Sequence, residues 1–190
     1  MSKTARRGAQ AAVLAAFLGW AANTTATESS ASVVDAPSLM APDARVRGVS
    51  PRVVAVINEA AARSESFRGL VAQIGTTDGI VYVAEGQCGH GVRACLLLTM
   101  TTMGDNRVLR ILVDPRKSDP DLMGSIGHEL QHAMEVLSHR SVRSYSAMIL
   151  LFKKSCDGCD RRFETDAAIA AGIAVRRELS ESVGPSGTLP

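Results

Sequence analysis

The sequence is poor in aromatic residues and in charge. Aromatic residues make up 4% of its 190 positions and charged residues 21%, and the formal net charge is only +2. It contains no cluster of lysine and arginine with interleaved aromatic residues, which is the usual mark of nucleic-acid binding. The composition therefore predicts no nucleic-acid partner. With 46% hydrophobic residues, a chain of this length suits one small globular domain.

Long hydrophobic runs are also scarce. The apolar stretch at residues 11–22 is too short to span a bilayer comfortably. It follows a basic segment and precedes small residues, which is typical of a cleaved export signal, here residues 1–26. A membrane anchor that is retained is the alternative. We expect an exported protein, periplasmic or extracellular, with no stable membrane insertion after cleavage.

Cysteine is scarce too, but the four copies fall in two local pairs. Exported proteins keep disulfides, so we expect bonds between Cys88 and Cys95 and between Cys156 and Cys159. Four cysteines allow three pairings, and the sequence does not choose between them. A structural zinc site formed by all four is a further alternative, although the spacing of the first pair is long for such a site.

The hydrophobic pattern predicts an α+β domain over residues 49–180. Residues 27–48 are rich in alanine, serine and proline and are expected to form a flexible lead-in, and residues 181–190 a disordered tail. Ser50-Pro51 is a typical helix start, with serine as N-cap and proline at the first helical position. A second helix is expected from Ser64 to Gly75.

A small sheet and further helices are expected after these two helices. Three β-rich runs predict an antiparallel three-stranded sheet: residues 80–83, 94–101 and 107–113. The first two runs are joined by turn material, and His90 at its tip is expected to be an exposed loop residue. Two C-terminal helices are expected, at about residues 142–153 and 162–179.

The sequence contains one His-Glu-x-x-His motif, at residues 128–132. Positions four apart share one face of a helix, so His128 and His132 can present two imidazoles to one metal ion. Glu129 lies one residue round the helix, where its carboxylate can act as general base on a water molecule. Glu135 shares the face of the histidines, while an apolar stripe at helical spacing marks the core face. Two ordinary surface histidines on an amphipathic helix are the alternative.

A catalytic zinc site needs a third protein ligand. His139 lies seven residues beyond His132, about 10 Å along a helix axis, which is too far to share the metal. Ser138 stands where a longer form of the motif has its third histidine. Glu164 is the best candidate, because the helix expected to carry it has small residues that allow close packing on the motif helix. Three other carboxylates are within reach: Asp157, Asp160 and Asp166.

Two blocks of the sequence, residues 126–133 and 163–168, resemble the zincin metallopeptidases of the glutamate-ligand type, the gluzincins, in a short form. The resemblance implies a zincin-like minimal domain. In such a domain a strand follows the edge of the cleft, the motif helix forms the floor, and Glu164 arrives from a following helix. The family often places an aspartate at the position of Ala168, where it supports a histidine. Asp166 is a possible replacement.

With zinc (Zn²⁺) held by His128, His132 and Glu164, the expected function is that of a secreted metallopeptidase with Glu129 as general base. The expected partner is a peptide or protein substrate, which could pair with the edge of the strand at residues 107–113. Three residues after the motif are candidates for stabilising an oxyanion: His139, Arg143 and Tyr145. The alternative is a non-catalytic exported module that binds zinc structurally or binds a partner.

Overall fold

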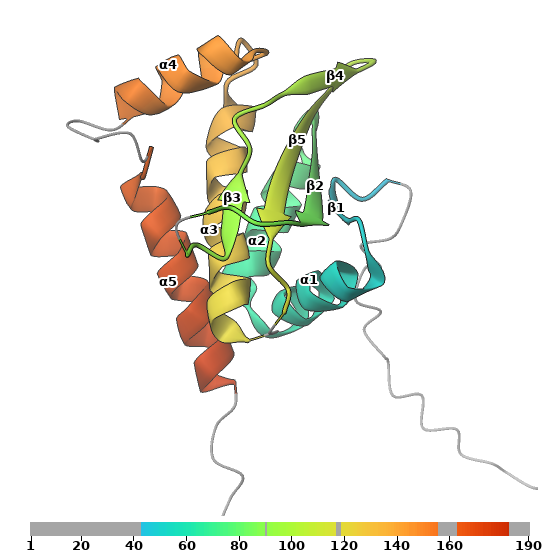
Figure 1. The fold of residues 1–190 in the computed structure, drawn as a ribbon, viewed down its shortest axis with the longest axis vertical. Coiled ribbons are helices and arrows are strands. Elements are labelled where there is room, and N and C mark those ends of the chain that lie inside the picture. The colour runs from blue at the N-terminus through green and yellow to red at the C-terminus, as the bar shows by residue number, and fades with distance from the viewer. Residues whose placement is uncertain (1–42, 90, 117–118, 156–162, 183–190) are drawn as a thin grey trace, which may run out of the picture. The chain divides into compact units, whose positions relative to one another are not determined.

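The computed structural model describes residues 43–89, 91–116, 119–155 and 163–182, which all belong to one compact unit (Figure 1). The strands are β1 (Val46–Gly48), β2 (Gly79–Glu85), β3 (Ala94–Leu96), β4 (Thr101–Met103) and β5 (Asn106–Val113). The helices are α1 (Pro51–Arg63), α2 (Glu65–Gly75), α3 (Pro120–Ser138), α4 (Tyr145–Ser155) and α5 (Asp166–Glu181). The expected α+β class is confirmed. None of the described helices has the length and apolar character needed to cross a membrane.

The two N-terminal helices begin where the sequence predicts. The Ser50 hydroxyl accepts a hydrogen bond from the Val53 N–H at 3.3 Å, and Pro51 occupies the first helical position of α1. The Ser64 hydroxyl caps α2 in the same way, accepting from the Phe67 N–H at 3.0 Å. Both caps satisfy amide groups that the first turn of a helix leaves without a partner. These starts could be predicted because cap and helix are adjacent in sequence.

The sheet differs from the prediction in its pairing. Its strand order is β1-β2-β5-β3, and β4 pairs with β5 beside β3. Strands β1, β2 and β5 are parallel, whereas β3 and β4 run antiparallel to β5. The expected hairpin between β2 and β3 is therefore wrong. The two long apolar strands, β2 and β5, pair with each other at the centre, and the short strands β3 and β4 are left at the edge, where short strands are favoured.

The predicted lead-in ends earlier than expected. Residues 46–48 form β1, and Val46 is fully buried against the core. The sequence gives no alternating pattern over three residues, so this strand could not be recognised. The predicted signal, the rest of the lead-in up to residue 42 and the tail beyond residue 182 lie outside the described residues.

Helix α3 lies between β3 and α5 and packs against both (Figure 1). It packs closely on α5 because glycines face each other. A Cβ atom added to Gly172 of α5 would come within 3.1 Å of both the Gly124 carbonyl oxygen and the His128 Cβ atom of α3. Ala168 and Gly172 are buried at this interface. Small residues in α5 therefore bring its N-terminal end next to the motif, as the sequence predicted.

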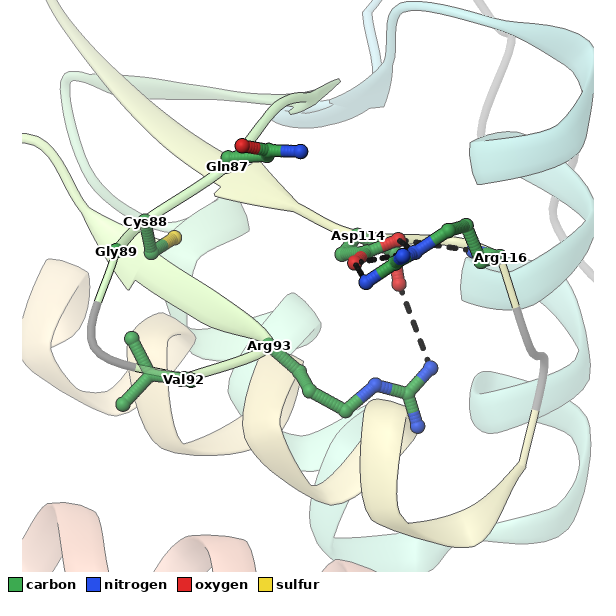
Figure 2. A pocket seen from close by; sticks show the side chains of 8 residues that line it. Gln87, Cys88, Gly89, Val92, Arg93, Asp114 and Arg116 are labelled. Carbon is green, nitrogen blue, oxygen red and sulfur yellow. Dashed lines mark hydrogen bonds and ion pairs between the residues drawn. The ribbon is translucent and has the colours of Figure 1, made fainter.

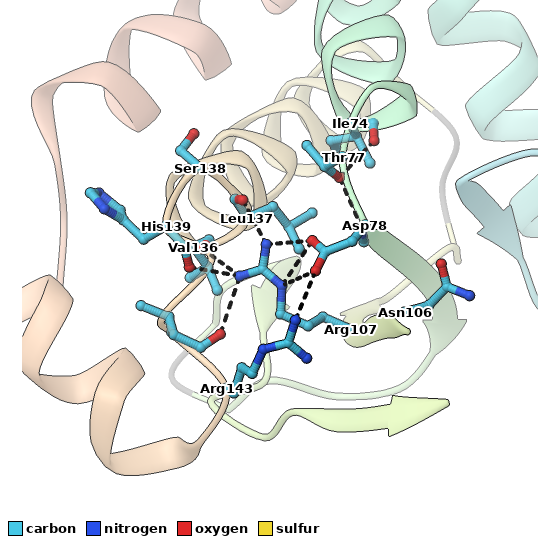
Figure 3. Close-up of polar contacts among 12 residues, drawn as sticks. Ile74, Thr77, Asp78, Asn106, Arg107, Val136, Leu137, Ser138, His139 and Arg143 are labelled. Carbon is cyan, nitrogen blue, oxygen red and sulfur yellow. Dashed lines mark hydrogen bonds and ion pairs between the residues drawn. The ribbon is translucent and has the colours of Figure 1, made fainter. Parts of the chain in front are cut away.

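A buried arginine fixes the C-terminal end of α3 to the sheet (Figure 3). Arg107 of β5 is fully buried and forms an ion pair with Asp78, with 2.5 Å between nitrogen and oxygen. Its guanidinium also donates to four backbone carbonyls at the end of α3 and just after it: Val136, Leu137, His139 and Val142. The hydrogen bond from Arg107 lowers the pKa of the Asp78 carboxyl. The last turn of the motif helix is thus held by a charged hydrogen-bond network.

Candidate metal centre

The structure brings His128, His132 and Glu164 together. One possible ligand atom of each lies within 4.8 Å of the others, and His128 Nε2 is 3.1 Å from Glu164 Oε2. Ligand atoms about 2.0 to 2.2 Å from a tetrahedral metal ion are roughly 3.4 Å apart. The observed spacing therefore fits a metal ion after small side-chain adjustments. Two imidazole nitrogens and one carboxylate oxygen are also a donor set found in catalytic metal sites.

Glu164 reaches this group from just outside a helix. Helix α5 begins at Asp166 with Thr165 as its N-cap, so Glu164 precedes the helix that was expected to contain it. Phe163 has a φ of 50°, which is uncommon for a residue other than glycine and turns the chain at this point. Asp166 is exposed and is not part of the group, while the other two candidate carboxylates lie outside the described residues.

A carboxylate orients the buried His132. Its Nδ1 atom is 3.1 Å from Glu135 Oε2, and Glu135 Oε1 accepts a hydrogen bond of 2.7 Å from the Thr165 hydroxyl. With Nδ1–H donated to Glu135, the Nε2 atom is left as the metal-binding nitrogen. Burial raises the pKa of Glu135, but the hydrogen bonds from His132 and Thr165 outweigh it and lower the pKa below its ordinary value. Glu135 is therefore ionised and suited to hold the imidazole.

His128 is supported by the backbone of α5 instead. The pKa of His128 is lowered, chiefly by burial and then by the nearby His132, while Glu164 and a hydrogen bond with the Ala168 backbone oppose this shift. A lowered pKa keeps the imidazole neutral, which is the form that binds metal ions. Ala168 occupies the position where the resembled family often has an aspartate. Here its backbone and the Glu135 side chain give the support expected from that aspartate.

Sequence reasoning placed Glu135 on the face of the histidines but gave it no role, and it missed Thr165 altogether. The signal for Glu135 was its spacing of three residues from His132, which makes the two side chains neighbours on a helix. The role of Thr165 had no local signal, because it depends on how α5 docks on α3.

Glu129 is half-buried beside the three candidate ligands. Its Oε2 atom accepts a hydrogen bond of 2.7 Å from the backbone N–H of Leu96 in β3. Burial raises the pKa of Glu129 to about 7, although His132 and the Leu96 N–H act in the opposite direction. A carboxyl group with a pKa near neutrality can both accept and return a proton at physiological pH.

Comparison with known proteins does not assign the chain to a family. No family model, no curated protein and no solved structure matches the chain. The resemblance to gluzincins therefore rests on the two sequence blocks that carry it.

The candidates for oxyanion stabilisation lie elsewhere. Arg143 contacts Asp78 at 3.4 Å and so belongs to the network around Arg107 (Figure 3). His139 is exposed, and its backbone carbonyl accepts a hydrogen bond from Arg107. Tyr145 is 58% exposed at the start of α4. These interactions place Arg143 and His139 at the C-terminal end of α3. At 1.5 Å per residue, this is about 10 Å or more along the helix from His132.

The expected substrate edge also needs correction. The strand at residues 107–113 is β5, which pairs with β2 on one side and with β3 and β4 on the other. It is not an edge strand, because the predicted antiparallel hairpin between β2 and β3 does not form. The edge strand beside the motif is β3, which packs against α3.

Two aromatic rings close one side of the site. The ring centroids of His132 and Phe152 are 5.4 Å apart with the rings nearly perpendicular, and those of Phe152 and Phe163 are 5.9 Å apart. Phe152 comes from α4 and is almost fully buried. These rings give His132 an apolar surround, which excludes water from that side of the ring.

The disulfide between Cys88 and Cys95 is confirmed. Cysteines joined in this way do not supply thiolate ligands, so these two do not form part of a four-cysteine zinc site. Cys156 and Cys159, like His90, lie outside the described residues. The disulfide connects the segment after β2 to β3, next to the residue whose N–H contacts Glu129.

A cavity of about 650 Å³ lies at the start of β3 and the end of β5 (Figure 2). Its polar lining includes Gln87, Arg93, Asp114 and Arg116. Arg93 forms an ion pair with Asp119 at 2.6 Å, and Arg116 with Asp114 at 2.5 Å. The cavity contains none of the three metal-ligand candidates, and its arginines are already paired with carboxylates. It therefore does not mark the metal centre.

Proposed function

We propose that the protein is an exported zinc-dependent metallopeptidase that hydrolyses peptide bonds. The observation that carries the proposal is the convergence of His128, His132 and Glu164 beside the half-buried carboxyl of Glu129. Three protein ligands leave a coordination position open for water or substrate, as catalytic zinc sites require. When bound, zinc would supply a Lewis acid that activates water and polarises a carbonyl group.

The residues of the chain supply the proton transfers and the positioning. Glu129 takes a proton from the attacking water and returns it to the leaving amine. Because burial raises the pKa of Glu129 to about 7, both transfers are accessible near neutral pH. Glu135 holds His132 through Nδ1, and a low pKa keeps His128 neutral. These contacts prepare two imidazole nitrogens to act as ligands.

The surroundings of Glu129 favour an extended peptide as substrate. β3 is an edge strand of the sheet and packs against the motif helix, so a peptide that pairs with its outer edge would pass over the candidate ligands. The partly exposed ring of Phe163, which packs on the buried Phe152, offers an apolar surface for a substrate side chain. A disulfide in the same strand supports the proposal of export, because disulfides persist in oxidising compartments.

The proposal is tested by metal content and cleavage measured on the same variants. We expect one zinc ion per chain by elemental analysis, and His128→Ala or His132→Ala should abolish it. His139→Ala is the matched control, because it removes an exposed histidine at the end of the same helix. A mixed peptide library should be cleaved in a zinc-dependent, chelator-sensitive manner.

Glu129→Gln should keep the zinc and lower cleavage about 100- to 10,000-fold, the usual contribution of a general base. Purified protein without stoichiometric metal would contradict the metal centre. Zinc bound without any cleavage of the library would support the non-catalytic module instead.

A further inference from the structure

The backbone N–H of Leu96 points away from the sheet. Antiparallel pairing with β5 uses the neighbouring residues of the strand: the Leu97 N–H donates to the Arg110 carbonyl and the Asp114 N–H to the Arg93 carbonyl, both at 2.9 Å. Backbone groups of successive residues alternate between the two edges of a strand. The Leu96 N–H therefore lies on the outer edge of β3 and takes no part in the ladder with β5.

The partner of this N–H is the carboxylate of the motif helix. Glu129 Oε2 accepts from it at 2.7 Å, at the short end of the range for N–H···O hydrogen bonds. The bond satisfies both groups at a part-buried position of the site. The edge-strand donor and the proposed general base thus mask each other in the free protein.

We propose that the Leu96 N–H binds the carbonyl oxygen of the peptide bond to be cleaved, and that this oxygen displaces Glu129 from the N–H as substrate docks. The inference rests on the proposed function, and it names the donor that the reaction requires. An incoming amide oxygen is a hydrogen-bond acceptor, so it can replace the carboxylate oxygen without leaving the N–H unsatisfied. Glu129 is then released to hold the attacking water.

The position of the N–H suits this role. It lies within hydrogen-bond distance of Glu129, so a carbonyl oxygen placed on it has its carbon close to a water held by the same carboxylate. As the water oxygen bonds to that carbon, its proton passes to Glu129 and the carbonyl π electrons move onto the oxygen held by Leu96. The C–N bond then breaks, and Glu129 returns the proton to the amine. A fixed backbone donor stabilises the charge that develops on the oxygen.

The exchange also explains why the side-chain candidates are not needed. The Arg143 side chain is committed to the network around Arg107, and the exposed His139 lies at the C-terminal end of α3, away from the metal-ligand group. The donor instead comes from the strand along which substrate is proposed to bind. Glu129 becomes available as a base only when a carbonyl group has taken its place, so the free protein holds its base in a latent state.

Leu96→Pro tests the proposal, with Leu96→Ala as the matched control. Both variants lose the leucine side chain, but only proline lacks the N–H, and no ladder bond to β5 is lost because this N–H faces outward. On the peptide that the parent cleaves best in the library, kcat of Leu96→Pro should be about 100- to 1,000-fold below that of Leu96→Ala. KM and zinc content should change far less.

Equal kcat in the two variants would overturn the inference while leaving the peptidase proposal intact. A parent that cleaves no library peptide would overturn both. If Leu96→Pro fails to fold, amide hydrogen exchange in the full chain decides: Glu129→Ala should speed exchange at Leu96 at least tenfold and leave Leu97, bonded to β5, unchanged. Unchanged exchange at Leu96 would show that Glu129 does not mask this donor.

Discussion

Replacing Glu135 with alanine should weaken metal binding although Glu135 is not a ligand. Its carboxylate joins two elements of the site, accepting from His132 Nδ1 at 3.1 Å and from the Thr165 hydroxyl at 2.7 Å. Without it the imidazole of His132 loses the partner that fixes its orientation and its tautomer. Metal binding must then also order the ring, and this costs free energy.

The expected size of the effect follows from those two bonds. Loss of a partner behind a ligating histidine typically lowers metal affinity about 10- to 100-fold. Each hydrogen bond also contributes about 1 kcal/mol to folding, so the metal-free Glu135→Ala variant should be about 1 to 2 kcal/mol less stable. Thr165→Val should separate the two effects. It removes the bond to Glu135 and the cap on α5 but leaves the bond between Glu135 and His132. Thr165→Val should therefore lower the unfolding free energy about as much as Glu135→Ala does, but it should lower metal affinity less.

Competition with a chromophoric chelator measures the affinity, and denaturant unfolding of the metal-free protein measures the stability. Glu59→Ala is the control, because it removes a partly exposed glutamate on α1 whose ion pair with Arg63 lies outside the site. Zinc affinity of Glu135→Ala within twofold of the parent would refute the positioning role.

Two further predictions concern the packing that holds the motif helix. The hydrogen bond from Arg107 lowers the pKa of Asp78 from 3.8, so its stabilising contribution is complete above pH 3.8 and is lost as pH falls through the lower folded-state value. Asp78→Asn should therefore lower the unfolding free energy by about 2 to 4 kcal/mol at pH 7. The difference in unfolding free energy between parent and variant should shrink when unfolding is measured below pH 3.8. Gly172→Ala should destabilise by about 1 to 2 kcal/mol and weaken metal binding, since the new Cβ would lie 3.1 Å from His128 Cβ. Gly69→Ala on α2, where an added Cβ meets nothing within 4 Å, should instead stabilise by about 0.5 to 1 kcal/mol.

Features that depend on residues close in sequence could be predicted. Serine caps fix the starts of α1 and α2, and the motif fixes the ligand spacing along α3. The disulfide between Cys88 and Cys95 belongs to the same class, because only six residues separate the cysteines. In each case the partners are held near each other by the chain itself, so their pattern in the sequence carries the information.

Strand pairing could not be predicted because it depends on competition among all strands. The turn-rich segment between β2 and β3 favoured a hairpin, yet β2 and β5 share the longer apolar inner face and pair in parallel. Arg107 illustrates the same limit. It lies on the inner face of β5 with Leu109 and Ile111, and burial of its charge is possible only because Asp78 and the carbonyls at the end of α3 surround it.

The candidate third ligand, Glu164, depends both on local sequence and on long-range packing. The identity of Glu164 could be inferred from the resemblance and from the small residues that follow it, but its position depends on how α5 docks. Gly172 lets α5 approach α3 closely, and Thr165, the residue after the ligand, both caps α5 and donates to Glu135. Capping the helix and supporting His132 thus use one hydroxyl. Because that hydroxyl adjoins Glu164, the docking that brings this candidate ligand to His128 also completes the support of the second histidine.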